Sequence, residues 1–111
     1  MTLRQKQSVF VQLVGQLIFE ALMRGYQLTF GETYRTPEQA ALNAKKGIGI
    51  ANSLHTQRLA IDLNLFKDGK FLDTTEAHRP LGEWWEQQHE LCRWGGRFKK
   101  PDGNHYEMRH P

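Results

Sequence analysis

Ala60-Ile61-Asp62-Leu63-Asn64-Leu65-Phe66 is a stretch of alternating apolar and polar residues, and it decides the fold. This period of two predicts a β-strand with one buried face. Its opposite face carries Asp62. The following Asp68-Gly69 pair is typical of a tight hairpin turn and predicts a returning strand at residues 70–72.

Three further elements are predicted upstream of this strand. Apolar residues spaced as on one helix face run from Phe10 to Ala21, and Gly25 stands where a helix commonly ends. Residues 26–30 then predict a short strand. In Thr36-Pro37-Glu38-Gln39, we expect Thr36 to cap a helix that ends near Gly47, with Gln39 completing a capping box.

Downstream, Pro80 and the apolar spacing that follows it predict a helix over residues 80–91. Residues 94–98 are expected to form a loop, and residues 105–108 a last short strand. The elements together predict an α+β fold with a small antiparallel sheet and helices packed on it.

Composition indicates one globular domain spanning residues 1–111, with 39% hydrophobic residues. The single cysteine, Cys92, excludes an internal disulfide and is expected in the core. The net charge of +3 is typical of an ordinary surface, and no basic arm favours nucleic acid. The apolar stretch at residues 9–23 is interrupted by polar residues, so we expect no membrane anchor and no secretory leader. We therefore expect a monomer made in a cytoplasm.

The histidines raise the question of a metal site. His55 precedes Asp62 by seven residues, and His105 begins the last predicted strand, three residues after Asp102. Two imidazoles and one carboxylate are a plausible catalytic zinc set, because such sites use three protein ligands and leave a fourth position open. A further carboxylate that is not a ligand serves as general base. Spacing alone leaves an ordinary polar cluster as the alternative.

Three segments resemble the M15 peptidases. Ser53-Leu54-His55 followed by Ala60-Ile61-Asp62 is similar to the family's Ser-x-His and Ala-x-Asp signature. Upstream, residues 34–39 are similar to its Tyr-Arg-Ser/Thr segment. The segments at residues 93–98 and 102–107 resemble the closing motif of its phage-type members. The family includes D-Ala-D-Ala carboxypeptidases, dipeptidases and phage L-alanyl-D-glutamate endopeptidases.

The resemblance implies a fold like that of hedgehog domains and D,D-peptidases, and it implies site roles. It makes His55, Asp62 and His105 the ligands of Zn²⁺ and Asp102 the general base. The carboxypeptidase branch usually has Glu in place of Asp102, so Asp favours the endopeptidase branch.

Substrate-binding roles are expected for three residues. The resemblance implies Arg35 near the substrate, where a guanidinium holds a carboxylate or polarises the scissile carbonyl. Pairing with a nearby glutamate is the alternative for Arg35. Ser53 is expected to support the site by a hydrogen bond. Arg58 stands where many members have glycine, which leaves two expectations: an altered loop, or a side chain that lines the cleft.

The remaining polar residues have weaker assignments. Glu107 is a competing base, a supporting partner of His105 or an exposed carboxylate, and Asn64 shares the polar face of Asp62. Asp102 lies in a sequence that also favours a simple turn. The other three histidines are expected at the surface: His78, His89 and His110.

The sequence thus predicts a zinc peptidase that acts on the stem peptide of peptidoglycan. We expect an endolysin that cuts the L-alanyl-D-glutamate bond after release to the cell wall during phage or prophage lysis. A D-Ala-D-Ala carboxypeptidase or dipeptidase is the first alternative, and a non-catalytic zinc-binding module is the second.

Overall fold

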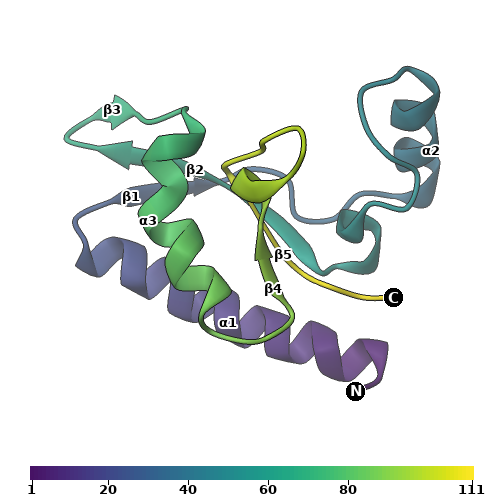
Figure 1. The fold of residues 1–111 in the computed structure, drawn as a ribbon, viewed down its shortest axis with the longest axis horizontal. Coiled ribbons are helices and arrows are strands. Elements are labelled where there is room, and N and C mark those ends of the chain that lie inside the picture. The colour runs from purple at the N-terminus through teal and green to yellow at the C-terminus, as the bar shows by residue number, and fades with distance from the viewer.

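The computed structural model describes residues 1–111 as three helices and a five-stranded sheet. The helices are α1 (Leu3–Met23), α2 (Pro37–Lys45) and α3 (Thr75–Glu86). The strands are β1 (Gln27–Phe30), β2 (Ala60–Lys67), β3 (Lys70–Phe71), β4 (Cys92–Trp94) and β5 (His105–Met108). Two short 3₁₀ helices are η1 (Leu54–Gln57) and η2 (Gly95–Arg97). The predicted α+β class is confirmed (Figure 1).

All strand pairs are antiparallel. The sheet order is β1-β2-β5-β4, and β3 pairs with β2 through the predicted Asp68-Gly69 hairpin. Both turn residues have positive φ, 52° and 76°, as a two-residue hairpin turn requires. Strand β2 is central, and its register with β5 sets Asp62 directly opposite His105.

Helix α1 follows its predicted apolar rhythm. The Thr2 hydroxyl accepts from the Gln5 amide, and the Gln5 side chain accepts from the Thr2 amide, so a capping box starts the helix. Gly25 follows the helix with φ of 87°, the conformation that glycine favours at a helix end. None of the three helices is both long and apolar enough to cross a lipid bilayer.

One core joins α1 and α3 to the sheet. Phe10 of α1 meets Trp85 of α3 edge-on at 5.8 Å, and Trp85 meets Tyr106 of β5 at 6.2 Å. The predicted inward face of β2 is buried, and so is Cys92. Helices α1 and α3 therefore support β2 and β5 through this core. These two strands carry Asp62 and His105 of the site.

Helix α2 lies apart from this core, at the right of Figure 1. It belongs to the long segment that connects β1 to β2. Thr36 caps it as predicted by accepting from the Gln39 amide. The predicted capping box is wrong in its second half, because the Gln39 side chain donates to Asn43 one turn later. Only Ala40 of α2 is fully buried.

The predicted helix over residues 80–91 is wrong at both ends. Helix α3 begins at Thr75 because the Thr74 hydroxyl accepts from the Ala77 amide, and Pro80 lies inside the helix. The helix ends at Glu86. Cys92 to Trp94 pair with β5 as strand β4, which the sequence analysis missed, and η2 occupies the predicted loop.

Candidate metal centre and cleft

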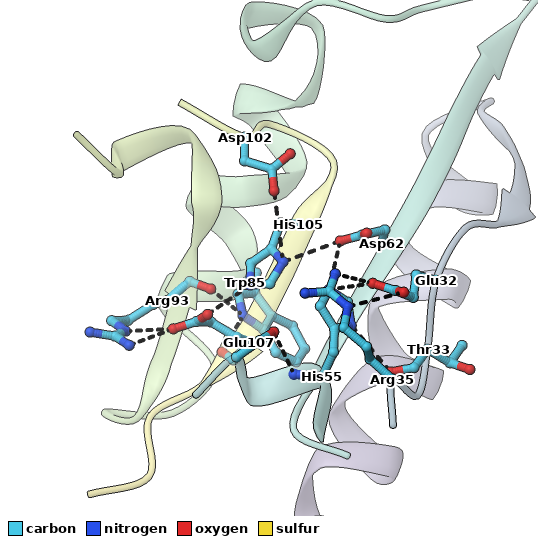
Figure 2. A network of polar contacts seen from close by, with 11 residues as sticks. Glu32, Thr33, Arg35, His55, Asp62, Trp85, Arg93, Asp102, His105 and Glu107 are labelled. Atoms are coloured by element: carbon cyan, nitrogen blue, oxygen red, sulfur yellow. Dashed lines mark hydrogen bonds and ion pairs between the residues drawn. The ribbon is translucent and has the colours of Figure 1, made fainter. Parts of the chain in front are cut away.

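Three predicted ligand side chains converge from three elements. His55 comes from η1, Asp62 from β2 and His105 from β5. Asp62 Oδ1 lies 3.3 Å from His55 Nε2 and 3.1 Å from His105 Nδ1. One ligand atom from each residue lies within 4.8 Å of the others (Figure 2). The geometry thus brings together the three residues that the sequence analysis assigned to one ion.

The position of His55 follows from a short capped turn. The Ser53 hydroxyl accepts from the His55 amide at 3.2 Å, and the Thr56 hydroxyl donates to the Ser53 carbonyl at 2.6 Å. The ring is fixed as well, because His55 Nδ1 lies 3.2 Å from the Thr33 carbonyl oxygen. Ser53 therefore holds the backbone of η1 at His55 by hydrogen bonds.

Arg58 ends η1 with φ of 56° and ψ of 36°. This left-handed conformation suits glycine best, which explains the glycine of the resembling sequences at this position. Arg58 thus holds the left-handed conformation that ends η1. Its guanidinium lies 4.0 Å from the centre of the Tyr34 ring, and its side chain lines a separate pocket beside α1.

Strand β5 orients His105. His105 Nε2 lies 2.6 Å from Glu107 Oε1, and the other ring nitrogen, Nδ1, therefore faces Asp62. Glu107 is only 4% exposed, and Arg93 of β4 donates to its other oxygen from Nε at 2.9 Å. The expected alternative of an exposed Glu107 is therefore wrong, because the β4–β5 register sets Arg93 opposite it. Glu107 supports His105, and both of its oxygens are occupied.

The charges of these groups depend on one another. Burial alone would raise the pKa of Asp62, but hydrogen bonds from His105 and His55 outweigh it and lower the pKa to about 2. Burial alone would lower the pKa of His105, whereas its bonds to Asp62 and Glu107 raise it to about 9. Asp62 is thus a carboxylate at neutral pH, which a metal ligand must be.

The donor set fits a divalent metal ion. Tetrahedral zinc with bonds of about 2.0–2.1 Å has ligand atoms roughly 3.3 Å apart, which is near the two separations from Asp62. In each histidine the ring nitrogen that points away from Asp62 has a hydrogen-bond partner. His55 Nδ1 pairs with the Thr33 carbonyl, and His105 Nε2 pairs with Glu107. Such bonds direct the other two nitrogens, His55 Nε2 and His105 Nδ1, toward a common ion. His55, Asp62 and His105 are therefore suited to hold it.

Asp102 lies beside this set on the loop before β5. Its Oδ2 is 3.9 Å from His105 Nδ1, and its side chain is 53% exposed. Partial burial, and then the nearby charge of Asp62, raise the pKa of Asp102. A raised pKa favours proton transfer. Two hydrogen bonds hold the loop: Trp94 Nε1 donates to the Gly103 carbonyl at 2.7 Å, and the Asp102 amide donates to the Gly95 carbonyl at 2.9 Å.

A cleft of about 710 Å³ opens over the three ligands. Arg35, Ser53 and Asp102 line it, whereas Arg58 does not. Arg35 is also paired with Glu32, whose Oε1 lies 3.7 Å from His55 Nε2. The lining includes residues that the sequence analysis did not assign to the site: Ile48, Ile50, Arg93, Phe98, Lys100 and His110.

Several polar residues lie elsewhere than expected. The prediction of surface positions is wrong for His78, which is 2% exposed and bonded to the Tyr106 hydroxyl at 2.8 Å. His110 lines the cleft, and His89 is half-buried, accepting from the Leu91 amide. Asn64 donates to Thr29 and does not contact the ligands.

A family model described as D-alanyl-D-alanine carboxypeptidase, of the M15 peptidases, matches residues 47–108, which is more than half of the chain. The chain belongs to the M15 peptidase family. The match includes all three ligands and Asp102, but it leaves out Arg35.

A solved structure extends the comparison to the fold of this M15 chain. The crystal structure of the Serratia marcescens L-Ala D-Glu endopeptidase ChiX superposes with a TM-score of 0.70 at 19% sequence identity. The superposition covers 88% of this chain and 78% of that chain. No curated protein matches the sequence.

Proposed function

We propose that this M15 protein is a zinc-dependent endopeptidase of bacterial peptidoglycan that cuts the L-alanyl-D-glutamate bond of the stem peptide. The observation that carries the proposal is the convergence of His55, Asp62 and His105 beneath an open cleft, with Asp102 at its edge. Family membership supports peptidase chemistry. The fold likeness to an L-Ala D-Glu endopeptidase, and the aspartate at position 102, favour the endopeptidase branch.

The chain's own residues divide the work of hydrolysis. His55, Asp62 and His105 would hold a zinc ion, which when bound would supply a polarised water and a Lewis acid for the carbonyl oxygen. Asp102 accepts the proton of the attacking water and passes it to the departing amine. Glu107 keeps His105 in the required tautomer.

Arg35 is the proposed partner of the substrate. Its guanidinium lines the cleft while the Glu32 carboxylate holds it in place. The Nη1 atom forms no hydrogen bond within the protein, which leaves donors for a substrate carbonyl or carboxylate. Arg35 thus assists in stabilising the developing negative charge on the scissile carbonyl.

A role in lysis is the biological part of the proposal. We propose an endolysin of a phage or prophage that is made in the cytoplasm and reaches the cell wall on release. A D-Ala-D-Ala carboxypeptidase is the second candidate, favoured by the description of the matching family model.

The deciding experiment is mass spectrometry of purified peptidoglycan incubated with the protein, with and without a zinc chelator. We expect new amino termini at D-Glu that are lost on chelation and return with zinc. Release of D-Ala alone would assign the protein to the carboxypeptidase branch. Absence of any chelator-sensitive product from several wall types would refute the peptidase and favour a zinc-binding module.

A further inference from the structure

A buried lysine links the start of α1 to the segment after β5. Lys6 is only 6% exposed, although lysine is rarely buried without a charged partner. Its ammonium contacts two acceptors, the Arg109 carbonyl at 3.2 Å and His110 Nδ1 at 3.0 Å. No carboxylate pairs with it. The buried ammonium of Lys6 therefore holds residues 109 and 110 in place.

This contact fixes the tautomer of His110. An ammonium group only donates hydrogen bonds, so Nδ1 of His110 accepts and the ring proton resides on Nε2. Nε2 has no hydrogen-bond partner in the protein, and no buried polar side-chain atom lacks one. Nε2 is therefore accessible to solvent, and His110 lines the same cleft as the three ligands. The ring offers one oriented N–H donor there.

Two other unassigned polar residues that line this cleft, Arg93 and Lys100, are also donors. Arg93 is half exposed and uses Nε and Nη2 for Glu107, which leaves Nη1 free. Lys100 is exposed and lines the cleft as well. Oxygen acceptors suit such a lining, and a carboxylate suits it best because two of the donors are cationic.

We propose that His110 is a substrate-binding residue that donates from Nε2 to a carboxylate of the bound stem peptide, with Lys6 as its positioning residue. The inference rests on the proposed function for the identity of the peptide. The Glu α-carboxyl of a γ-linked stem peptide is the carboxylate that the test addresses. Lys6 acts only through the orientation of the His110 ring.

The test uses fluorescently labelled L-Ala-γ-D-Glu-L-Lys, with the Glu α-carboxyl free or amidated. Binding to the chelated, metal-free full chain is measured first, so turnover plays no part. His110→Ala is expected to weaken binding of the free acid about tenfold, as loss of a hydrogen bond to a charged group does. The amidated peptide is expected to lose little. His110→Gln, whose amide nitrogen reaches the place of Nε2, is expected to restore part of the loss.

Matched controls come from neighbouring positions. Arg109→Ala removes an exposed side chain beside His110, and Arg4→Met removes an exposed charge on α1 near Lys6. Both are expected to bind as the unaltered protein does. Lys6→Met is expected to weaken binding, and Lys6→Met with His110→Ala is expected to be no weaker than His110→Ala alone.

Three results would overturn the inference: His110→Ala binding like Arg109→Ala, equal losses for both peptides, or additive effects of Lys6 and His110. Circular dichroism checks folding, and the His110 pair decides the matter if Lys6→Met does not fold. With zinc restored, His110→Ala is expected to raise KM more than it lowers kcat. A protein that binds the peptide but cleaves no wall would refute the proposed function and leave this inference standing.

Discussion

Glu107 Oε1 lies 2.6 Å from His105 Nε2, and this contact determines which ring nitrogen of His105 faces Asp62. The pair is buried, so His105 cannot exchange this partner for water. Glu107, with Arg93 on its other oxygen, thereby positions His105 and is not itself one of the three converging residues. A metal-binding measurement is the most direct way to detect such an effect.

Replacement of Glu107 is expected to weaken zinc binding. Glu107→Ala leaves the outer nitrogen of His105 without an acceptor, and loss of such a partner typically costs about 10–100-fold in metal affinity. Glu107→Gln keeps a neutral acceptor, and its zinc affinity is expected to lie between those of Glu107→Ala and the unaltered protein. Competition with a chromophoric chelator measures the affinity, with Glu90→Gln at an exposed site as the control. Unchanged affinity in Glu107→Ala would show that the contact has no such role.

Asp102→Asn is expected to separate metal binding from turnover. The amide cannot accept the proton of water, so kcat should fall by about two orders of magnitude or more. Asp102 is not one of the three converging ligands, so the bound zinc, measured by elemental analysis, should stay at the unaltered level. His105→Ala should lose both zinc and activity. Full activity of Asp102→Asn would remove Asp102 from the mechanism.

Two glycines in helices are expected to respond in opposite directions to alanine. A Cβ at Gly82 of α3 would lie 2.1 Å from the Trp94 ring, so the ring that holds the Asp102 loop must shift. We expect Gly82→Ala to lower the free energy of unfolding by roughly 1–3 kcal/mol. Gly15 of α1 has open space around it, and Gly15→Ala should raise this free energy by about 0.5–1 kcal/mol. Urea unfolding measures both, and a stabilised Gly82→Ala would contradict the packing described for Trp94.

His78 is expected to make stability depend on pH. Burial lowers its pKa to about 4 from an ordinary value of 6.5. Between these values the unfolded chain binds a proton that the folded protein does not. The contribution of neutral His78 to the free energy of unfolding is therefore complete above pH 6.5. It decreases by roughly 3 kcal/mol as the pH falls to about 4.

Urea unfolding at pH 7 and pH 5 measures this loss. His78→Asn places an amide near the Tyr106 hydroxyl without a titrating ring, and it should reduce the difference between the two pH values. His89→Asn, at the half-buried histidine after α3, serves as the control and should leave the difference intact. An equal pH dependence in all three proteins would assign the acid sensitivity to other groups.

The parts of the fold that were predictable depend on local pattern. Strand β2 and its hairpin followed from alternation and from Asp68-Gly69, and the metal set followed from a resemblance confined to short motifs. The hairpin and each separate motif depend on residues that are near one another in sequence. The location of Arg35 in the cleft was expected from the same motifs.

The error at the start of α3 has one cause. The expectation that Pro80 begins the helix is wrong because Thr74 caps it, and proline is tolerated inside at the cost of one hydrogen bond. A helix that begins after Thr74 sets His78 on one face with Leu81 and Trp85, which predicts its burial. Contacts such as Lys6 with His110 join residues 104 positions apart, and no local pattern reveals them.

The register of β2 with β5 ties metal binding to the end of folding. Asp62 and His105 lie 43 positions apart and meet only when the two strands pair in one alignment. A slip of one residue would turn the imidazole of His105 to the opposite side of the sheet. Contacts between distant segments form late because long loops must close first. Nascent or misaligned chains therefore hold no complete set of the three side chains, and the proposed metal ion would bind only after the sheet has assembled correctly.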